Sequence, residues 1–143
     1  MNRLLRPLLL SGLFIAAAFG QTTTPDCGHS TVAEFSPSLQ PKAESFLGAL
    51  KAAVKAQDKR KVAEMSRYPL LVNMLKGHRQ IKTSAQLIAE YDRLFAPSIR
   101  RAIEQQTPAC LFANWQGVMI GTGEVWFEEQ ANGSMKIKTL NLP

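Results

Sequence analysis

The apolar residues of this chain change their spacing at Pro108, and this change limits the folds that the chain can adopt. Before Pro108 they recur at the i, i+3, i+4 and i+7 spacing that lines one face of a helix. The first such set is Ala43, Phe46, Leu47, Leu50 and Val54. After Pro108 come runs rich in Val, Ile, Trp and Phe, which are typical of strands. Helices followed by hairpin-linked strands indicate an α+β domain. We expect N-terminal helices packed on a curved antiparallel sheet, whose concave side leaves a pocket.

Capping and turn residues divide this pattern into elements. Asp58 can cap a short helix, Thr83 and Gln86 form a capping box, and the Asn-Gly pair at 132–133 predicts a hairpin. Gly121-Thr122-Gly123 predicts a bulge or bend within one long strand. The predicted elements, in order, are a helix from residue 41, a short helix over 59–66, a strand over 68–75, a short strand over 79–82, a helix that begins at the capping box and continues to Phe95, a shorter helix after Pro97, and strands over 110–115, 117–129 and 135–142.

The first twenty residues have the pattern of a cleaved signal peptide. Arg3 and Arg6 precede an apolar run over 8–19, and Ala18 and Gly20 supply the small residues before a cut after Gly20. The alternative is a membrane anchor, but a span needs about 20 apolar residues and this run is shorter. We therefore predict an exported protein, periplasmic or secreted, with no stable membrane insertion after cleavage. The predicted organisation is a signal peptide (1–20), a flexible leader (21–42) and one α+β cone domain (43–143).

The charge of the chain does not favour a nucleic-acid partner. The sequence has 17 Lys and Arg against 11 Asp and Glu, and removing the two arginines of the predicted signal peptide leaves a net charge of +4. This is a mild excess, and its residues are scattered over different elements rather than clustered in one basic stripe. We interpret them as a solvated surface.

Two cysteines in an exported chain predict one disulfide, between Cys27 and Cys110. This bond would tie the leader to the start of a predicted strand. The alternative is a pair of free thiols with Cys110 buried. His29 and His78 have no second ligand three or four residues away, so we predict no metal site, and no motif indicates a cofactor.

The chain over 46–142 resembles the nuclear-transport-factor-2-like superfamily, a cystatin-like cone that also contains ketosteroid isomerases and many small exported bacterial proteins. The residues that carry the resemblance are Phe46-Leu47-x-x-Leu50, Asp58 with Val62-Ala63 and Tyr68-Pro69-Leu70, Ile81-x-x-Ser84 before Leu87-Ile88-x-x-Tyr91-Asp92, Leu94-Phe95, and the strand from Gln116 to Phe127. The resemblance implies a pocket between the concave sheet and the long helix, and a dimer formed through the exposed sheet face. It implies little about activity, because the superfamily includes isomerases, dehydratases, transport factors and non-catalytic modules.

Six side chains are candidates for lining the pocket. They combine carboxylates with aromatic groups that offer an apolar body and a polar tip. The candidates are Tyr68, Tyr91, Asp92, Trp115, Glu124 and Trp126. If Glu124 points into the concavity, burial would raise its pKa and make it a base or a ligand anchor. Otherwise it lies on the outer face or pairs with Lys136 or Lys138. The aromatic residues could equally pack in the core or on a dimer face.

These observations favour non-catalytic binding of a small apolar or amphipathic ligand, or of a protein partner, with a homodimer as one form. One alternative is a cofactor-free isomerase or lyase that transfers a proton, with Glu124 or Asp92 as base and Tyr68 or Tyr91 as donor. The base and oxyanion donors of ketosteroid isomerases are not matched residue by residue, so no residue is assigned a catalytic role. Another alternative is an envelope interaction protein of the inhibitor or immunity type.

Overall fold

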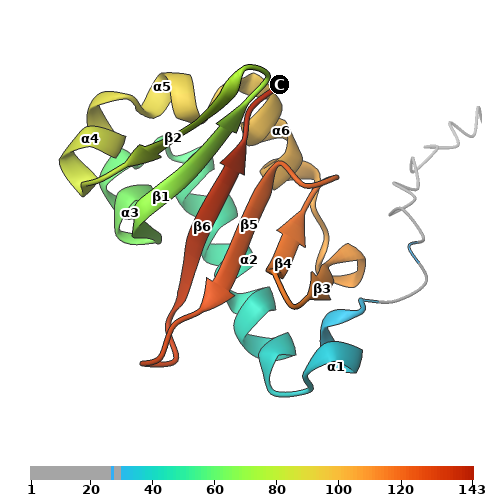
Figure 1. The fold of residues 1–143 in the computed structure, drawn as a ribbon. Helices are drawn as coiled ribbons and strands as arrows, with labels where there is room; N and C mark the ends of the chain where they lie inside the picture. Colours follow the sequence, from blue (N-terminus) through green and yellow to red (C-terminus); the bar gives the residue numbers. More distant parts are fainter. Residues whose placement is uncertain (1–26, 28–29) are drawn as a thin grey trace, which may run out of the picture.

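The computed structural model describes Cys27 and residues 30–143, and it confirms the α+β class. The predicted signal peptide and the first part of the predicted leader, apart from Cys27, lie outside the described residues. Helices cover one face of a six-stranded sheet and, in the described part of the chain, leave the other face open (Figure 1). The elements are α1 (Val32–Phe35), α2 (Leu39–Lys55), α3 (Lys59–Glu64), β1 (Ser66–Met74), β2 (Gly77–Ile81), α4 (Ser84–Ala89), α5 (Tyr91–Leu94), α6 (Pro97–Gln105), the 3-10 turn η1 (Pro108–Cys110), β3 (Phe112–Asn114), β4 (Gly117–Ile120), β5 (Val125–Glu129) and β6 (Met135–Asn141).

The sheet has the strand order β2-β1-β6-β5-β4-β3, and it is mixed rather than wholly antiparallel as predicted. The strands from β3 to β6 form the expected antiparallel succession, and β1 pairs antiparallel with β2. The exception is the central pair, in which β1 and β6 run parallel. A hairpin cannot produce a parallel pair, but the chain between β1 and β6 passes through the helical layer and returns in the same direction.

The strand predicted over 117–129 is two strands. β4 ends at Ile120 and β5 begins at Val125. Gly121 and Gly123 adopt positive φ values of 69° and 121°, so the chain turns back on itself instead of bulging. We call residues 121–124 the β4–β5 turn. This correction moves Glu124 from the middle of a strand into a turn.

Two other predicted boundaries also differ from the structure. The helix expected from the capping box to Phe95 is interrupted at Glu90, which separates α4 from α5. The strand expected to open at Pro69 begins earlier, at Ser66, and Pro69 lies where the pairing of β1 with β6 shifts register between Ser66 and Leu71. A proline fits such an irregular position because it has no N–H to donate to the ladder.

The predicted leader is folded from residue 30 onward. Helix α1 lies within the range 21–42, and its Val32 is fully buried in the core. Helix α2 begins at Leu39 instead of residue 41, and Leu39 is also buried. Apolar side chains that can reach the core therefore override the Ser- and Pro-rich composition on which the leader prediction depended.

The predicted disulfide is confirmed. Cys27 and Cys110 are bonded, with their Cα atoms 5.3 Å apart. Cys110 does not open a strand, however, because it ends η1, and β3 begins at Phe112.

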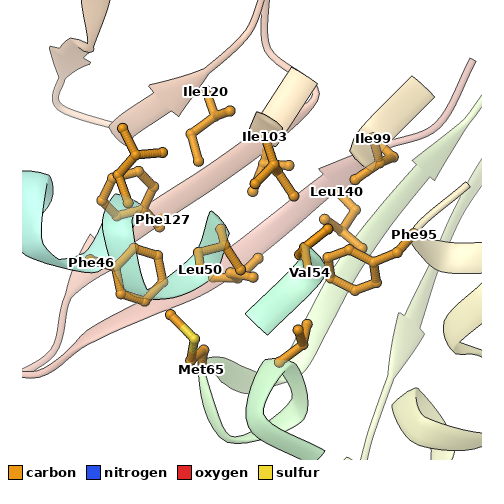
Figure 2. Packing of buried hydrophobic residues seen from close by; sticks show 14 of the residues in the cluster. Phe46, Leu50, Val54, Met65, Phe95, Ile99, Ile103, Ile120, Phe127 and Leu140 are labelled. Carbon is orange, nitrogen blue, oxygen red and sulfur yellow. The ribbon is translucent and has the colours of Figure 1, made fainter. Parts of the chain in front are cut away.

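The core fills the space between α2 and the sheet. Phe46 of α2 stacks on Phe127 of β5, with ring centroids 4.7 Å apart. Farther along α2, Leu50 and Val54 point toward side chains of the sheet and α6 (Figure 2). The resemblance predicted a pocket in this place, and buried side chains occupy it instead. No helix within Cys27 and residues 30–143 combines the length and the apolar character that crossing a membrane requires.

Candidate functional site

The structure does not bring the six predicted pocket residues into one site. Tyr91 is 1% exposed and belongs to the core, where it stacks on Phe95 with ring centroids 4.9 Å apart. Asp92, its neighbour in sequence, points to solvent and pairs with Lys59 at 2.9 Å. Adjacent residues of a short helix point in different directions, so these two cannot act on one ligand.

The two tyrosine hydroxyls are in different surroundings. Tyr68 donates its hydroxyl proton to the carbonyl of Ala63 at 2.8 Å and so links β1 to α3. Burial raises the pKa of Tyr68, and a hydrogen bond with Ser84 only partly opposes this. Burial also raises the pKa of Tyr91, whose hydroxyl has no hydrogen-bond partner among the described residues. Both hydroxyls therefore stay protonated at neutral pH, one as a structural donor and one buried in the core.

Trp115 and Trp126 are brought together, on the open face of the sheet. Trp126 pairs with Met119 on one side and with Thr139 on the other, and the pairing continues to the remaining strands. The result is a single register-matched row across the sheet, which we call the outer row. Its members are Phe112, Met119, Trp126, Thr139, Leu71 and Gln80.

The outer row is apolar over most of its length and is covered by no described helix (Figure 1). Val125 and Phe127 point to the core, so the alternation of β5 places Trp126 on the opposite face. Phe112 is 39% exposed, and Trp115, in the turn between β3 and β4, is 84% exposed. A shallow depression of about 410 Å³ lies beside the row. Its lining residues are Leu71, Asn73, Trp115, Gln116, Trp126, Lys138, Thr139 and Asn141.

Polar side chains border the row on both sides. Toward one end of the strands, Asn73 donates to Asn141 at 2.7 Å. Toward the other end, Glu128 accepts from Lys138 at 2.8 Å and pairs with Arg67 at 3.0 Å. Burial alone would raise the pKa of Glu128, but the hydrogen bond from Lys138 and the positive charges of Lys138 and Arg67 lower it overall. This face is therefore an apolar band between an amide pair and a charged cluster that holds both signs.

Glu124 lies in the β4–β5 turn, at a different surface. Its carboxylate accepts from the backbone N–H of Thr122 at 2.6 Å and hydrogen-bonds the Thr122 hydroxyl at 3.1 Å. It does not pair with Lys136 or Lys138, as one alternative proposed. Lys136 instead donates to a backbone carbonyl, and Lys138 binds Glu128.

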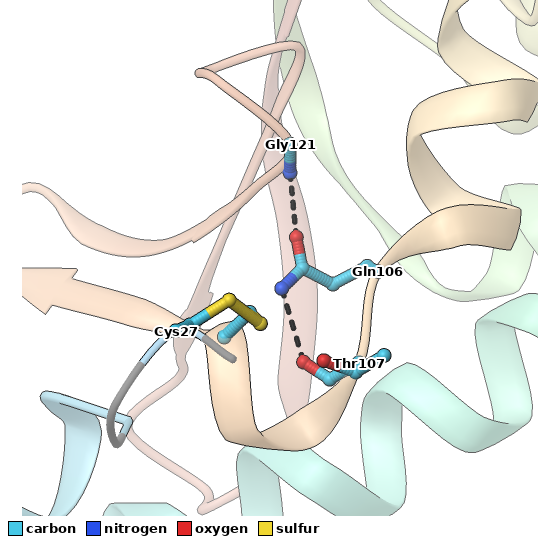
Figure 3. Close-up of a disulfide and its surroundings, with 5 residues drawn as sticks. Cys27, Gln106, Thr107 and Gly121 are labelled. Carbon is cyan, nitrogen blue, oxygen red and sulfur yellow. Dashed lines mark hydrogen bonds between the residues drawn. A yellow bond between two sulfur atoms is a disulfide. The ribbon is translucent and has the colours of Figure 1, made fainter. Parts of the chain in front are cut away.

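The cavity that Glu124 lines also contains the disulfide. This cavity, about 400 Å³, lies between α6, the β4–β5 turn and the bonded Cys27 and Cys110. The side chain of Gln106 fixes its shape, because it accepts from the N–H of Gly121 at 2.7 Å and donates to the carbonyl of Thr107 at 3.0 Å (Figure 3).

Sequence reasoning missed Gln106, Leu71 and the register that aligns Phe112 with Met119. A buried glutamine gives no pattern in a single sequence. The register could have been found by reading Gly121 and Gly123 as a turn, because pairing the two halves of 117–129 across that turn aligns Met119 with Trp126.

Among Cys27 and residues 30–143, no group of His, Cys, Asp and Glu side chains is arranged to hold a metal ion. Comparison of the chain with protein-family models, with curated proteins and with solved structures finds no match.

Proposed function

We propose that this chain is an exported, non-catalytic binding protein that receives a protein partner on the open face of its sheet. The single observation that carries the proposal is the outer row, in which apolar side chains from four of the six strands are aligned by register and left uncovered by any described helix. Uncovered apolar patches of this kind mark interaction sites in proteins.

The composition of the face supports a protein as the partner. Interface centres are enriched in Trp, Phe and Met, and they are surrounded by a polar rim. Here Trp126 and Met119 form the apolar centre with Phe112 extending it to the edge strand β3, while the Asn73–Asn141 pair and the Glu128 cluster form the rim. With strands about 4.8 Å apart, a row across six strands is about 24 Å long, which suits a flat protein surface better than a small ligand.

A second copy of the chain is the partner that these charges favour. In a contact with two-fold symmetry the same patch meets itself, so the patch must be complementary to itself. The rim satisfies this condition because Glu128 lies beside Arg67 and Lys138. A face that carried one sign of charge would repel its own copy.

Export is supported by the predicted signal peptide and by the disulfide between Cys27 and Cys110, since such bonds persist in oxidising compartments. The resemblance to the nuclear-transport-factor-2-like superfamily stays a prediction. Proton transfer has less support than binding, because Glu124 and Asp92 lie in different places and each is held by another side chain.

The test is the oligomeric state of the mature protein. Sedimentation velocity over a range of concentrations should show a dimer. Both tryptophans of the chain lie on this face, so their emission should shift to the blue as the dimer forms. Met119→Lys should raise the dimer dissociation constant roughly 100-fold or more, because each copy would bury an unpaired ammonium.

Leu75→Lys is the matched control, because Leu75 is 88% exposed in the β1–β2 turn and lies outside the outer row. It should leave the dissociation constant unchanged. A dimer that tolerates Met119→Lys would contradict the proposed surface. A chain that stays monomeric at all concentrations would exclude a second copy as the partner.

A further inference from the structure

The cavity beside the disulfide is separate from the outer row, and we call it the α6 cavity. Ser98, Arg101 and Gln105 of α6 line one wall at the i, i+3 and i+7 positions, which lie along one stripe of a helix. Thr122 and Glu124 of the β4–β5 turn also line the cavity. Its volume of about 400 Å³ falls at the lower end of the roughly 300–1,000 Å³ that small-molecule sites span.

Arg101 brings an uncompensated positive charge to this cavity. Its side chain is exposed, and within the described residues it has neither an ion-pair partner nor a hydrogen-bond partner. Its neighbour Arg100 does not line the cavity. A free guanidinium offers two parallel donors that match a carboxylate.

Glu124 brings a negative charge that is fixed in place. The backbone N–H and the hydroxyl of Thr122 hold its carboxylate at 2.6 and 3.1 Å. The close approach of this carboxylate requires Gly121, because a Cβ at that position would lie 2.2 Å from Glu124 Oε2. Glu124 and Arg101 line the same cavity but do not form an ion pair with each other. Their opposite charges therefore both remain available to a ligand.

The walls that carry these charges are braced by covalent and buried contacts. The Cys27–Cys110 bond closes one side of the cavity. Gln106 connects the β4–β5 turn to the chain that follows α6, through Gly121 and Thr107 (Figure 3). Because Glu124 is held in place before the ligand arrives, its side chain loses little entropy on binding.

From this geometry we infer that the α6 cavity binds a small zwitterion of the amino-acid or short-peptide class. The ligand carboxylate lies against the Arg101 guanidinium, and the ligand ammonium donates to the Glu124 carboxylate. The Ser98 hydroxyl and the Gln105 amide supply neutral hydrogen bonds. A ligand with a single charge would leave one of the two protein charges facing its uncharged part, so the site discriminates in favour of ligands that carry both. This inference is independent of the proposed sheet-face partner.

The test uses L-alanyl-L-alanine as the probe in an NMR titration of the ¹⁵N-labelled mature protein. Amide shifts should appear at α6 and the β4–β5 turn. N-acetylation, which removes the ammonium, and C-terminal amidation, which removes the carboxylate, should each weaken binding roughly tenfold or more, as expected for the loss of a charge-assisted hydrogen bond. Free L-alanine tests whether a shorter separation of the charges is also accepted.

Arg101→Gln should weaken binding by a similar factor and abolish the discrimination against the amidated dipeptide. Arg100→Gln is the matched control, because it removes the same charge from the adjacent position and should leave binding unchanged. Arg101 is exposed, so its replacement should not prevent folding, and the amide spectrum verifies this. The inference is overturned if neither zwitterion shifts these amides, or if the blocked dipeptides bind as well as the free one. Equal binding by Arg101→Gln would also overturn it.

Discussion

The disulfide between Cys27 and Cys110 should contribute a large part of the stability of this protein. The two cysteines are 83 residues apart, and in the chain-entropy model closing a loop of this length removes about 4.5 kcal/mol of entropy from the unfolded state at 25 °C. The folded chain offsets only a little of this on reduction. Val32 is already buried, and Thr31 donates its N–H to the carbonyl of Leu111 at 3.2 Å, so noncovalent contacts hold the chain from Thr31 onward without the bond. We therefore expect the free energy of unfolding to fall by about 2–4 kcal/mol when the bond is broken.

The assay is urea unfolding of the mature protein, followed by tryptophan emission, with and without a phosphine reductant. For an m-value of about 1–3 kcal/mol per molar urea, a loss of 3 kcal/mol lowers the midpoint by about 1–3 M. The Cys27→Ser/Cys110→Ser double variant should unfold at the reduced midpoint and be insensitive to the reductant. The reasoning is refuted if the oxidised and reduced proteins unfold at the same midpoint, or if the double variant matches the oxidised protein.

Three further substitutions test individual contacts. Gly121→Ala should destabilise the fold by about 1 kcal/mol more than Gly77→Ala in urea unfolding. Both positions have positive φ, but only at Gly121 does the new Cβ collide with the carboxylate that Thr122 holds. Tyr91→Phe should be neutral or stabilising by up to about 1 kcal/mol, because the buried hydroxyl that it removes has no described partner; a larger loss would reveal one. The hydrogen bond from Arg79 holds the pKa of Glu90 below its ordinary value, so the pair stabilises the fold above that value and this contribution disappears as pH falls through the lowered pKa. Glu90→Gln should therefore be less stable than the unmodified protein at pH 7, and the difference should vanish in acid; a constant difference would exclude the ion pair as its cause.

The class of the fold could be predicted from the sequence because its strongest patterns are local. The helical spacing of Phe46, Leu50 and Val54 specifies the apolar face of α2, and the structure buries that face. The direction of β6 relative to β1 could not be predicted in this way. It depends on how the whole helical layer returns the chain to the sheet, and no pair of neighbouring residues encodes that path.

The positions of Glu124 and of the two tryptophans were harder to predict, because they depend on the conformation of one short segment. Gly121-Thr122-Gly123 allows either a bulge or a reversal, and both require glycine for the same conformational reason. A bulge would keep Glu124 within the sheet, where it could face a pocket. The reversal places it in a turn beside α6. The structure brings the two tryptophans to one depression, but their location on the open face depends on the strand pairing that the reversal creates.

The alternation of side chains along β5 explains both the filled core and the uncovered outer row. Val125 and Phe127 point inward, and Phe127 stacks on Phe46 where an open cone would keep a pocket. Because side chains alternate along a strand, the residues that close this pocket also place Trp126 and Glu128 on the opposite face. A sheet with Trp126 outside and no helix above it leaves that apolar surface uncovered. Filling the concave side with Phe127 therefore leaves the outer row and the α6 cavity as the two places where we propose binding.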